Sequence, residues 1–192
     1  MQTIKQKALT LALVLLLPLS SWGLSYPSQF DEIFKAYSGH YLPGIDWRLL
    51  KAQCYQESLL NPVAVSPVGA KGLCQFMPAT WRDMQRQLDI KAGPFNAVAN
   101  ARAAAYYMRQ LRRGWSSPRP ERDRHSLAMA SYNAGFGNLL SSQRACGGAP
   151  GYLDIIACLP DITGHHSQET ITYVKRIWHW HEDMIHGHTD SP

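Results

Sequence analysis

Apolar residues recur at helical spacing in one segment after another, and this periodicity constrains the fold more than any other feature of the chain. Trp81, Met84 and Leu88 would share one face of a helix, because residues three and four apart lie on the same side. Proline, asparagine, aspartate and serine stand where such segments begin. The sequence therefore predicts helices that start with Asp46, Pro78, Asn96, Phe136 and Ser167, and another that includes Leu127–Asn133.

The breaks between these segments contain proline and glycine. Asn61-Pro62 should stop the helix that Asp46 begins, because proline cannot continue a helix. Residues 114–122 read as a loop. The stretch Pro62–Gly72 is rich in small and turn-forming residues, and a small hairpin near residues 63–75 is the only strand that we expect. With no repeat or long linker, the chain is predicted to form a single, mainly α domain.

The N-terminus has the order of a secretory signal peptide. Lys5 and Lys7 precede an apolar run over residues 8–17, and small residues follow. The run is shorter than the roughly 20 residues that a transmembrane helix needs. We expect a signal peptide over residues 1–23 and an exported domain over residues 24–192, located in the periplasm. An uncleaved membrane anchor is the alternative reading.

The charge of the chain is mildly positive. The formal net charge is +5, and removal of Lys5 and Lys7 with the signal peptide would leave +3. This excess suits a polyanionic neighbour such as a bacterial envelope. The densest basic segment, Arg109–Arg124, is interrupted by Pro118 and Pro120 and reads as a solvated helix face and a loop. Nucleic acid is therefore not an expected partner.

Four cysteines in an exported chain favour disulfides, and three pairings are possible. Cys146 and Cys158 bracket a loop with glycine and proline, whereas Cys54 and Cys74 flank the region around Glu57. We therefore favour Cys54–Cys74 with Cys146–Cys158. The chain has no CxxC, which argues against a zinc ribbon and a thioredoxin-type redox site.

The C-terminal part is rich in histidine, but its spacing does not define a metal site. Glu182 and His186 would lie one turn apart on a helix, and no third ligand is placed beside them. We expect solvated histidines, no metal and no cofactor. These histidines are His165, His166, His179, His181, His186 and His188.

Glu57 is the main candidate for catalysis. It shares the inward stripe of its helix with Leu50 and Cys54, at i, i+4 and i+7. Burial of a carboxyl disfavours its charged form and raises its pKa, which suits a general acid at neutral pH. Most carboxylates on helices are surface charges, so this position alone does not assign a function.

Four motifs in a fixed order strengthen the assignment. Together they resemble the soluble lytic transglycosylase (SLT) family, whose catalytic domains have a goose-type lysozyme-like fold. The resemblance extends from about Phe30 to Ile185, which implies one SLT catalytic domain with its core at about residues 30–185. The motifs are Glu57-Ser58, Gly72-Leu73-Cys74-Gln75-Phe76-Met77-Pro78, Ser131-Tyr132-Asn133-Ala134-Gly135, and Glu169-Thr170 with Tyr173-Val174.

The resemblance implies a role for each matching residue. Glu57 matches the single catalytic acid/base of the family, and Ser58 matches a residue that helps to orient the N-acetyl group of the substrate. The remaining matches are expected to bind the saccharide. Gln75 and Met77 would line the groove, Tyr132 would hydrogen-bond near the acid with Asn133 supporting the same wall, and Glu169 would lie at the groove end.

The chain departs from the family at two places. Family members commonly carry methionine where Cys74 stands and an aliphatic residue where Cys54 stands, so a disulfide would replace packing beside Glu57. The segment between Asn138 and Glu169, with its own cysteine pair, is also unusual. It leaves the shape of one end of the groove open.

The resemblance implies cleavage of peptidoglycan between N-acetylmuramic acid and N-acetylglucosamine. Ordinary glycosidases use two carboxyl groups, and no motif places a second one opposite Glu57. A 1,6-anhydromuramoyl product, formed without water, is therefore expected. A water-using muramidase and a non-enzymatic glycan-binding assembly protein are the alternatives. Enzymes of this kind often serve secretion, conjugation, pilus or phage machines, and we expect a monomer.

Overall fold

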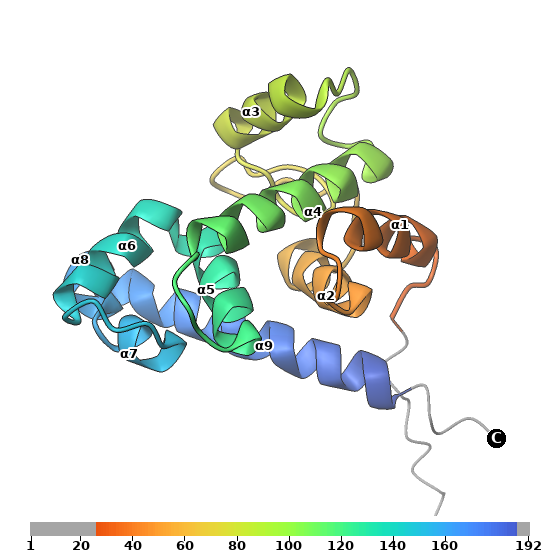
Figure 1. Ribbon diagram of the computed structural model, residues 1–192. Helices are drawn as coiled ribbons and strands as arrows, with labels where there is room; N and C mark the ends of the chain where they lie inside the picture. The colour runs from red at the N-terminus through yellow and green to blue at the C-terminus, as the bar shows by residue number, and fades with distance from the viewer. Residues whose placement is uncertain (1–25, 188–192) are drawn as a thin grey trace, which may run out of the picture.

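The computed structural model describes residues 26–187, and within this range the chain is mainly α, as predicted. The predicted signal peptide and His188 lie outside the described residues. Figure 1 shows the arrangement of the elements. They are α1 (Asp31–Tyr41), α2 (Trp47–Ser58), α3 (Pro78–Leu88), α4 (Ala97–Gly114), α5 (Glu121–Ala134), α6 (Phe136–Ala145), α7 (Tyr152–Ala157), α8 (Leu159–Thr163), the 3-10 helix η1 (Gly164–His166) and α9 (Ser167–His186).

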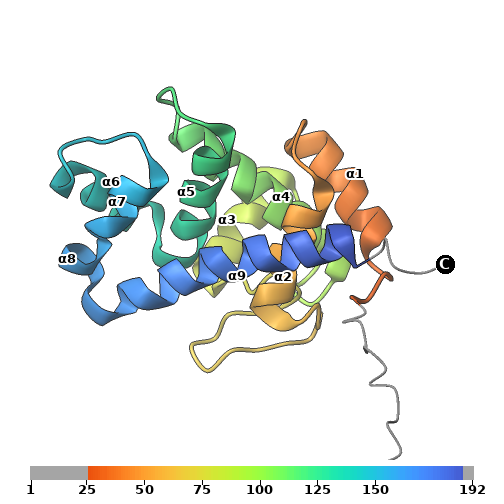
Figure 2. The same cartoon turned by 90° about the horizontal axis from the view of Figure 1, so that it is seen from below.

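The long helix α9 connects the two ends of the molecule. It packs against α2 and α5, and in Figure 2 it crosses the view from α8 at one end to α1 at the other. Helix α4 packs against α1, α3 and α5, and its alanine-rich face is buried, as the spacing predicts. Small residues on that face allow the neighbouring helices to approach closely. The arrangement places the C-terminal end of α2 beside α9.

Two predicted helix starts are confirmed by their capping hydrogen bonds. The Asp46 side chain accepts a hydrogen bond from the backbone N–H of Arg48 at 2.9 Å. The Asn96 side chain accepts one from the N–H of Ala99, also at 2.9 Å. Each bond satisfies an N–H that the first helical turn leaves unpaired. Pro78 occupies the first turn of α3, where its missing N–H costs nothing.

Two helix boundaries differ from the prediction, and a third difference concerns α1. Helix α2 ends at Ser58, before Asn61-Pro62, because Leu59 adopts a left-handed conformation with φ of 54°. Ser167 is not the cap of α9. Helix η1 leads directly into α9, and the Ser167 hydroxyl donates to the carbonyl of Gly164 at 2.7 Å. Helix α1 was not predicted, although Phe34, Ser38 and Tyr41 lie on its buried face.

The long loop between α2 and α3 contains no regular strand in the described chain. Isolated antiparallel bridges join Val65 to Lys71 and Lys71 to Phe76, so the hairpin region is reduced to two single contacts. Gly72 has φ of 84°, and an added Cβ would lie 2.1 Å from the carbonyl oxygen of Pro94. Only glycine fits this close approach. Within residues 26–187 no helix combines the length and apolar character needed to span a membrane.

Candidate active site

Glu57 lies near the C-terminal end of α2, where its carboxyl faces a pocket against α9. The pocket has a volume of about 340 Å³. Three segments far apart in sequence contribute to it, namely α2, the end of α5 and the first half of α9. The lining residues are Gln56, Glu57, Asn133, Gln168, Glu169, Thr172, Tyr173 and Arg176. The fold therefore gives the predicted acid access to a ligand-sized space.

The surroundings of Glu57 favour its protonated form. The residue keeps partial exposure because it faces the pocket, but packed protein withdraws the carboxyl from bulk water. This desolvation raises the pKa of Glu57 to about 7, and the nearby charge of Glu169 adds to the rise. A hydrogen bond from Tyr173 acts in the opposite direction. At neutral pH a large fraction of Glu57 can therefore donate a proton.

Tyr173 is a site residue to which the sequence analysis gave no role. Its hydroxyl donates a hydrogen bond of 2.6 Å to Oε1 of Glu57. Burial and the charge of Glu57 raise the pKa of Tyr173 well above its ordinary value, so the hydroxyl stays protonated and remains a donor. The bond fixes one carboxyl oxygen and leaves the other for chemistry. Tyr173 stands in one of the recognised motifs, but only the packing of α9 on α2 brings it to Glu57.

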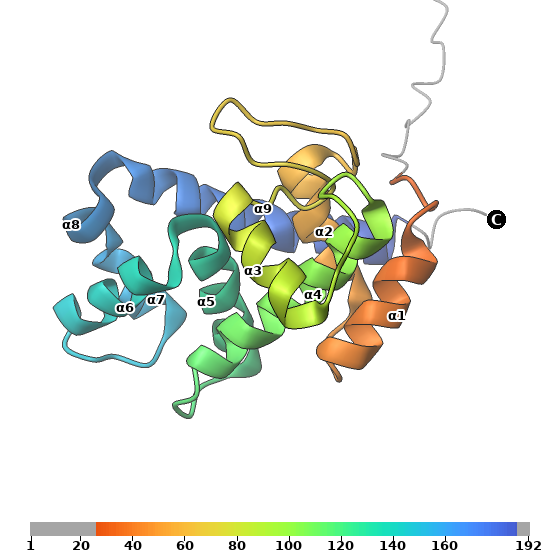
Figure 3. The ribbon, with the colours of Figure 1, turned by 90° about the horizontal axis from the view of Figure 1, so that it is seen from above.

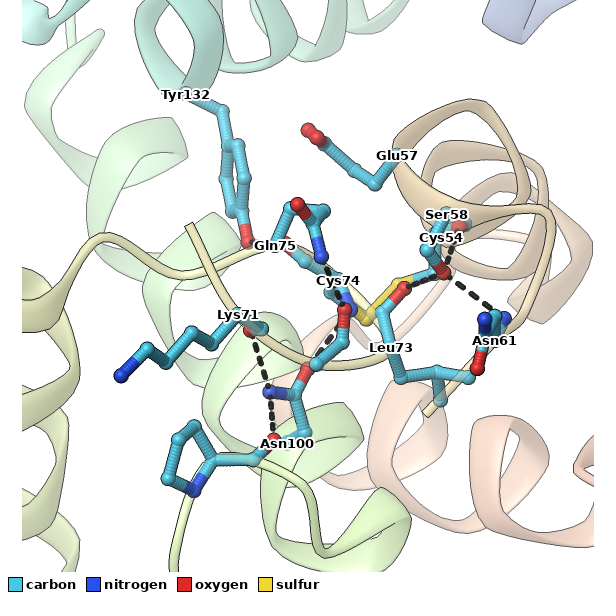
Figure 4. The surroundings of a disulfide bond; sticks show 12 residues. Cys54, Glu57, Ser58, Asn61, Lys71, Leu73, Cys74, Gln75, Asn100 and Tyr132 are labelled. Atoms are coloured by element: carbon cyan, nitrogen blue, oxygen red, sulfur yellow. Dashed lines mark hydrogen bonds between the residues drawn. A yellow bond between two sulfur atoms is a disulfide. The ribbon is translucent and has the colours of Figure 1, made fainter. Parts of the chain in front are cut away.

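Tyr132 holds the groove loop, which is the long loop over residues 59–77 between α2 and α3, in place beside Glu57. Its hydroxyl donates to the carbonyl of Cys74 at 2.7 Å, and its ring packs against Phe76 and Tyr107. Figure 4 shows the Tyr132 ring, the Gln75 side chain and the Glu57 carboxylate converging from three separate segments. The hydrogen bond of Tyr132 thus goes to the loop next to Glu57, whereas the direct bond to the acid comes from α9.

Gln75 and Met77 lie on the same loop, with different exposure. Gln75 adopts a left-handed conformation with φ of 51°, and its amide Nε2 donates to the carbonyl of Gly72 at 2.8 Å and of Ala64 at 3.2 Å. Its amide oxygen is left for another partner. Met77 is 44% exposed at the start of α3. Both positions suit the predicted contact with saccharide, which stays a prediction.

Ser58 makes its hydrogen bonds within the protein. Its hydroxyl donates to the carbonyl of Leu73 at 2.6 Å and accepts from the N–H of Asn61 at 3.1 Å. It therefore connects the end of α2 to both arms of the groove loop, as Figure 4 shows. Its predicted contact with the N-acetyl group stays a prediction, and in this structure Ser58 positions the loop beside Glu57.

Asn133 and Glu169 form the wall between the Glu57 pocket and a second cavity. The Asn133 amide donates to Oε1 of Glu169 at 3.3 Å and accepts from the Thr170 hydroxyl at 2.7 Å. The second cavity has a volume of about 420 Å³ and includes Ile162 and His166. The unusual insertion between α6 and α9 therefore lines part of this second cavity.

The cysteines pair as the sequence favoured. Cys54 is joined to Cys74 with a Cα separation of 4.4 Å, and Cys146 is joined to Cys158 with a Cα separation of 5.8 Å. The first disulfide connects α2, one turn before Glu57, to the residue that precedes Gln75 (Figure 4). The second closes the insertion that carries α7.

Asn100 is a second residue that the sequence analysis missed. It is fully buried on α4, and its side-chain oxygen accepts from the N–H of Cys74 at 2.8 Å. Its amide nitrogen donates to the carbonyls of Pro94 at 2.8 Å and Lys71 at 3.5 Å. A polar residue on the alanine-rich face of α4 was the available signal. Asn100 positions the groove loop and has no contact with Glu57.

The histidines of the C-terminal part do not converge. Within residues 26–187, no group of three or more histidine, cysteine or acidic side chains is placed to hold a metal ion. Oε1 of Glu182 lies 3.8 Å from Nη2 of Arg122, and Nε2 of His181 lies 3.3 Å from Oδ2 of Asp46. The candidate chemistry therefore rests on Glu57 and its neighbours.

Comparison with known proteins gives a consistent result. The family model described as "Transglycosylase SLT domain" matches residues 35–154. The membrane-bound lytic murein transglycosylase F of Idiomarina loihiensis is 36% identical over 170 residues, covering 81% of this chain and 35% of that protein. Its counterpart in Alcanivorax borkumensis is 37% identical over 135 residues, covering 68% of this chain and 27% of that protein. The chain thus spans about a third of the length of these relatives.

A solved structure confirms the lysozyme-like helical fold. The 70 kDa soluble lytic transglycosylase of Escherichia coli superposes with a TM-score of 0.64 at 25% sequence identity. The match covers 82% of this chain and 24% of that chain.

Proposed function

Because this chain belongs to the transglycosylase SLT domain family, we propose that it cleaves the β-1,4 bond between N-acetylmuramic acid and N-acetylglucosamine in peptidoglycan as a lytic transglycosylase. The observation that carries the proposal is the geometry of Glu57. A desolvated carboxyl with a pKa of about 7, bonded by Tyr173, opens to a groove. No cofactor enters the proposed reaction.

In the first step, protonated Glu57 donates its proton to the glycosidic oxygen. The bond between that oxygen and the anomeric carbon of N-acetylmuramic acid breaks, and positive charge develops on the sugar ring. The N-acetyl carbonyl of the substrate can stabilise this charge, as in substrate-assisted glycosidases. The free oxygen of Glu57 is suited to this donation, because Tyr173 holds the other one.

In the second step, Glu57 acts as a carboxylate. It takes the proton of the C6 hydroxyl of the same muramic acid residue while that oxygen attacks the anomeric carbon. The attack is intramolecular, and proximity of this kind can be worth roughly 7–11 kcal/mol. The product carries a 1,6-anhydromuramoyl end, no water is consumed, and Glu57 regains its proton.

Glu169 gives the water-using alternative a specific basis. This exposed glutamate lines the same pocket as Glu57, so it could activate a water molecule as the second carboxylate of a muramidase. Its oxygen accepts from Asn133, which orients it along the wall of the groove. We favour the water-free route because the Glu169 carboxylate is exposed and already accepts the hydrogen bond of Asn133 in the groove wall.

Purified sacculi and soluble glycan strands test the proposal. Wild-type protein should release products that each lack one water relative to a hydrolase product, as mass spectrometry measures. Glu57→Gln should abolish release while retaining sedimentation with sacculi, and Glu169→Gln should keep the water-free product. Hydrolysed ends from the wild type would assign a muramidase. Binding without any release would assign a glycan-binding protein.

The place of action follows from the predicted signal peptide. We propose that the exported domain, residues 24–192, acts as a monomer in the periplasm, where peptidoglycan is its substrate. Service to a secretion, conjugation, pilus or phage machine is part of the same proposal. A pull-down from crosslinked envelopes by the exported protein would identify such a machine.

A further inference from the structure

A third cavity shares no lining residue with the Glu57 pocket and is lined by several arginines. It lies between the C-terminal end of α1, the C-terminal part of α4 and the first turn of α5, and its volume is about 530 Å³. Its lining residues are Tyr41, Leu42, Pro43, Arg109, Arg112, Arg113, Ser116, Glu121 and Arg124. The fold thus gathers the basic segment that looked interrupted in the sequence.

The four arginines of this cavity differ in their partners. The Glu121 carboxylate accepts hydrogen bonds from Arg112 at 2.5 Å and from Arg124 at 3.0 Å, which fixes two guanidinium groups at the rim. Arg109 and Arg113 have no hydrogen-bond or ion-pair partner among residues 26–187. They lie one turn apart on α4, where like charges destabilise a helix. Two guanidinium groups therefore line the cavity without a paired carboxylate in the described chain.

Arg119, in the adjoining loop, also has a guanidinium nitrogen without a hydrogen-bond partner among the described residues. Its guanidinium stacks on the Trp115 ring, 5.1 Å from the centroid, and its Nε donates to the carbonyl of Ser117. Its Nη1 is buried and has no partner in the described chain. Burial and the charge of Arg124 lower the pKa of Arg119. Buried donors of this kind are normally hydrogen-bonded, so Arg119 adds a donor that an anion could satisfy.

Positive charge predominates in the cluster. The four arginines at the cavity and Arg119 outnumber the nearby carboxylates of Glu121 and Asp123 by three. A favourable interaction with the C-terminal end of α4 accounts for Arg112 and Arg113, but not for Arg109, Arg119 and Arg124. Arginine binds phosphate through paired N–H donors in a fixed geometry.

The cluster lies on the side opposite the groove loop. Figures 2 and 3 both show the connection between α4 and α5 projecting away from the long loop between α2 and α3. A ligand at the cluster would therefore leave the groove open. We propose that this cavity binds the phosphate of anionic membrane lipid headgroups, which would turn the groove away from the membrane surface.

Vesicle sedimentation of the processed protein, purified after export, tests the proposal. Wild type should bind vesicles that contain phosphatidylglycerol and should not bind pure phosphatidylcholine. Arg109→Ala/Arg113→Ala should weaken binding roughly 30-fold, since each basic residue near an anionic surface contributes to the attraction and two are removed. Cleavage of soluble glycan strands should be unchanged, because these residues lie outside the Glu57 pocket.

The matched control is Arg82→Ala/Arg144→Ala, which removes the same charge from exposed positions on α3 and α6. The control should bind like wild type. Equal losses in both double variants would reduce the effect to net charge and overturn the site. Wild type that binds inorganic phosphate in calorimetry but no anionic vesicles would overturn the lipid source. Wild type that binds neither would overturn the anion site itself.

Discussion

Replacement of Glu57 by glutamine should stabilise the folded protein at alkaline pH while it abolishes cleavage. The amide has nearly the shape of the carboxyl and can accept the same hydrogen bond from Tyr173. It carries no charge, so it avoids the cost of placing a carboxylate in a desolvated position. The residue proposed to do the chemistry is thus predicted to lower the stability of the fold.

The magnitude follows from the pKa of Glu57, which burial raises from 4.5 to about 7. One pKa unit corresponds to 1.36 kcal/mol, so the carboxylate costs up to about 3 kcal/mol at high pH. Solvent screening at the partly exposed Glu57 reduces this cost, so we expect Glu57→Gln to raise the free energy of unfolding at high pH by about 1–3 kcal/mol. Because the folded-state pKa is the higher one, the stability that protonated Glu57 contributes is fully present below pH 4.5 and is lost as pH rises through 7.

Urea denaturation at pH 4 and pH 8 measures the effect. The free energy of unfolding of Glu57→Gln should match that of wild type at pH 4 and exceed it at pH 8. Glu32→Gln is the control, since Glu32 is an exposed partner of Lys35 on α1 and should give little change at either pH. An equal difference between Glu57→Gln and wild type at both pH values would refute a desolvated carboxyl.

Three further predictions concern the groove. In wild type, kcat/KM should fall as pH rises through about 7. The hydrogen bond from Tyr173 lowers the pKa of Glu57, so its removal in Tyr173→Phe should raise that pKa and move the fall to higher pH. An unmoved profile contradicts this. Cys54→Ala/Cys74→Ala should lose roughly 3 kcal/mol of unfolding free energy, because the disulfide no longer restricts the unfolded chain, and some cleavage activity. A variant with full activity and stability would show that the disulfide has no such role. In Asn100→Ala, urea denaturation should show a loss of about 2–4 kcal/mol of unfolding free energy, because the N–H of Cys74 and the carbonyl of Pro94 lose their partner. A loss below 1 kcal/mol contradicts this.

The sequence predicted most of the helices, because their signals are local. The side-chain caps at Asp46 and Asn96 and the proline at the start of α3 depend only on neighbouring residues. Helices α7 and α8 contain six and five residues, which is too short for a periodic pattern to appear. Ser167 was assigned as a cap because serine favours that position, but η1 already supplies the turn before it.

The candidate site was predictable only in part, because its chemistry depends on contacts across the chain. Glu57 was found from its place on the apolar stripe of one helix. Its hydrogen bond to Tyr173 joins residues 116 positions apart, and no local pattern encodes that pairing. The arginine cluster could not be predicted for the same reason, because Arg109 and Arg124 lie on different helices and line one cavity only after folding. A charged group takes its function from the groups that tertiary packing places around it. Desolvation raises the pKa of Glu57 despite the hydrogen bond from Tyr173, and crowding of arginines with too few carboxylates is the basis of the proposed anion site.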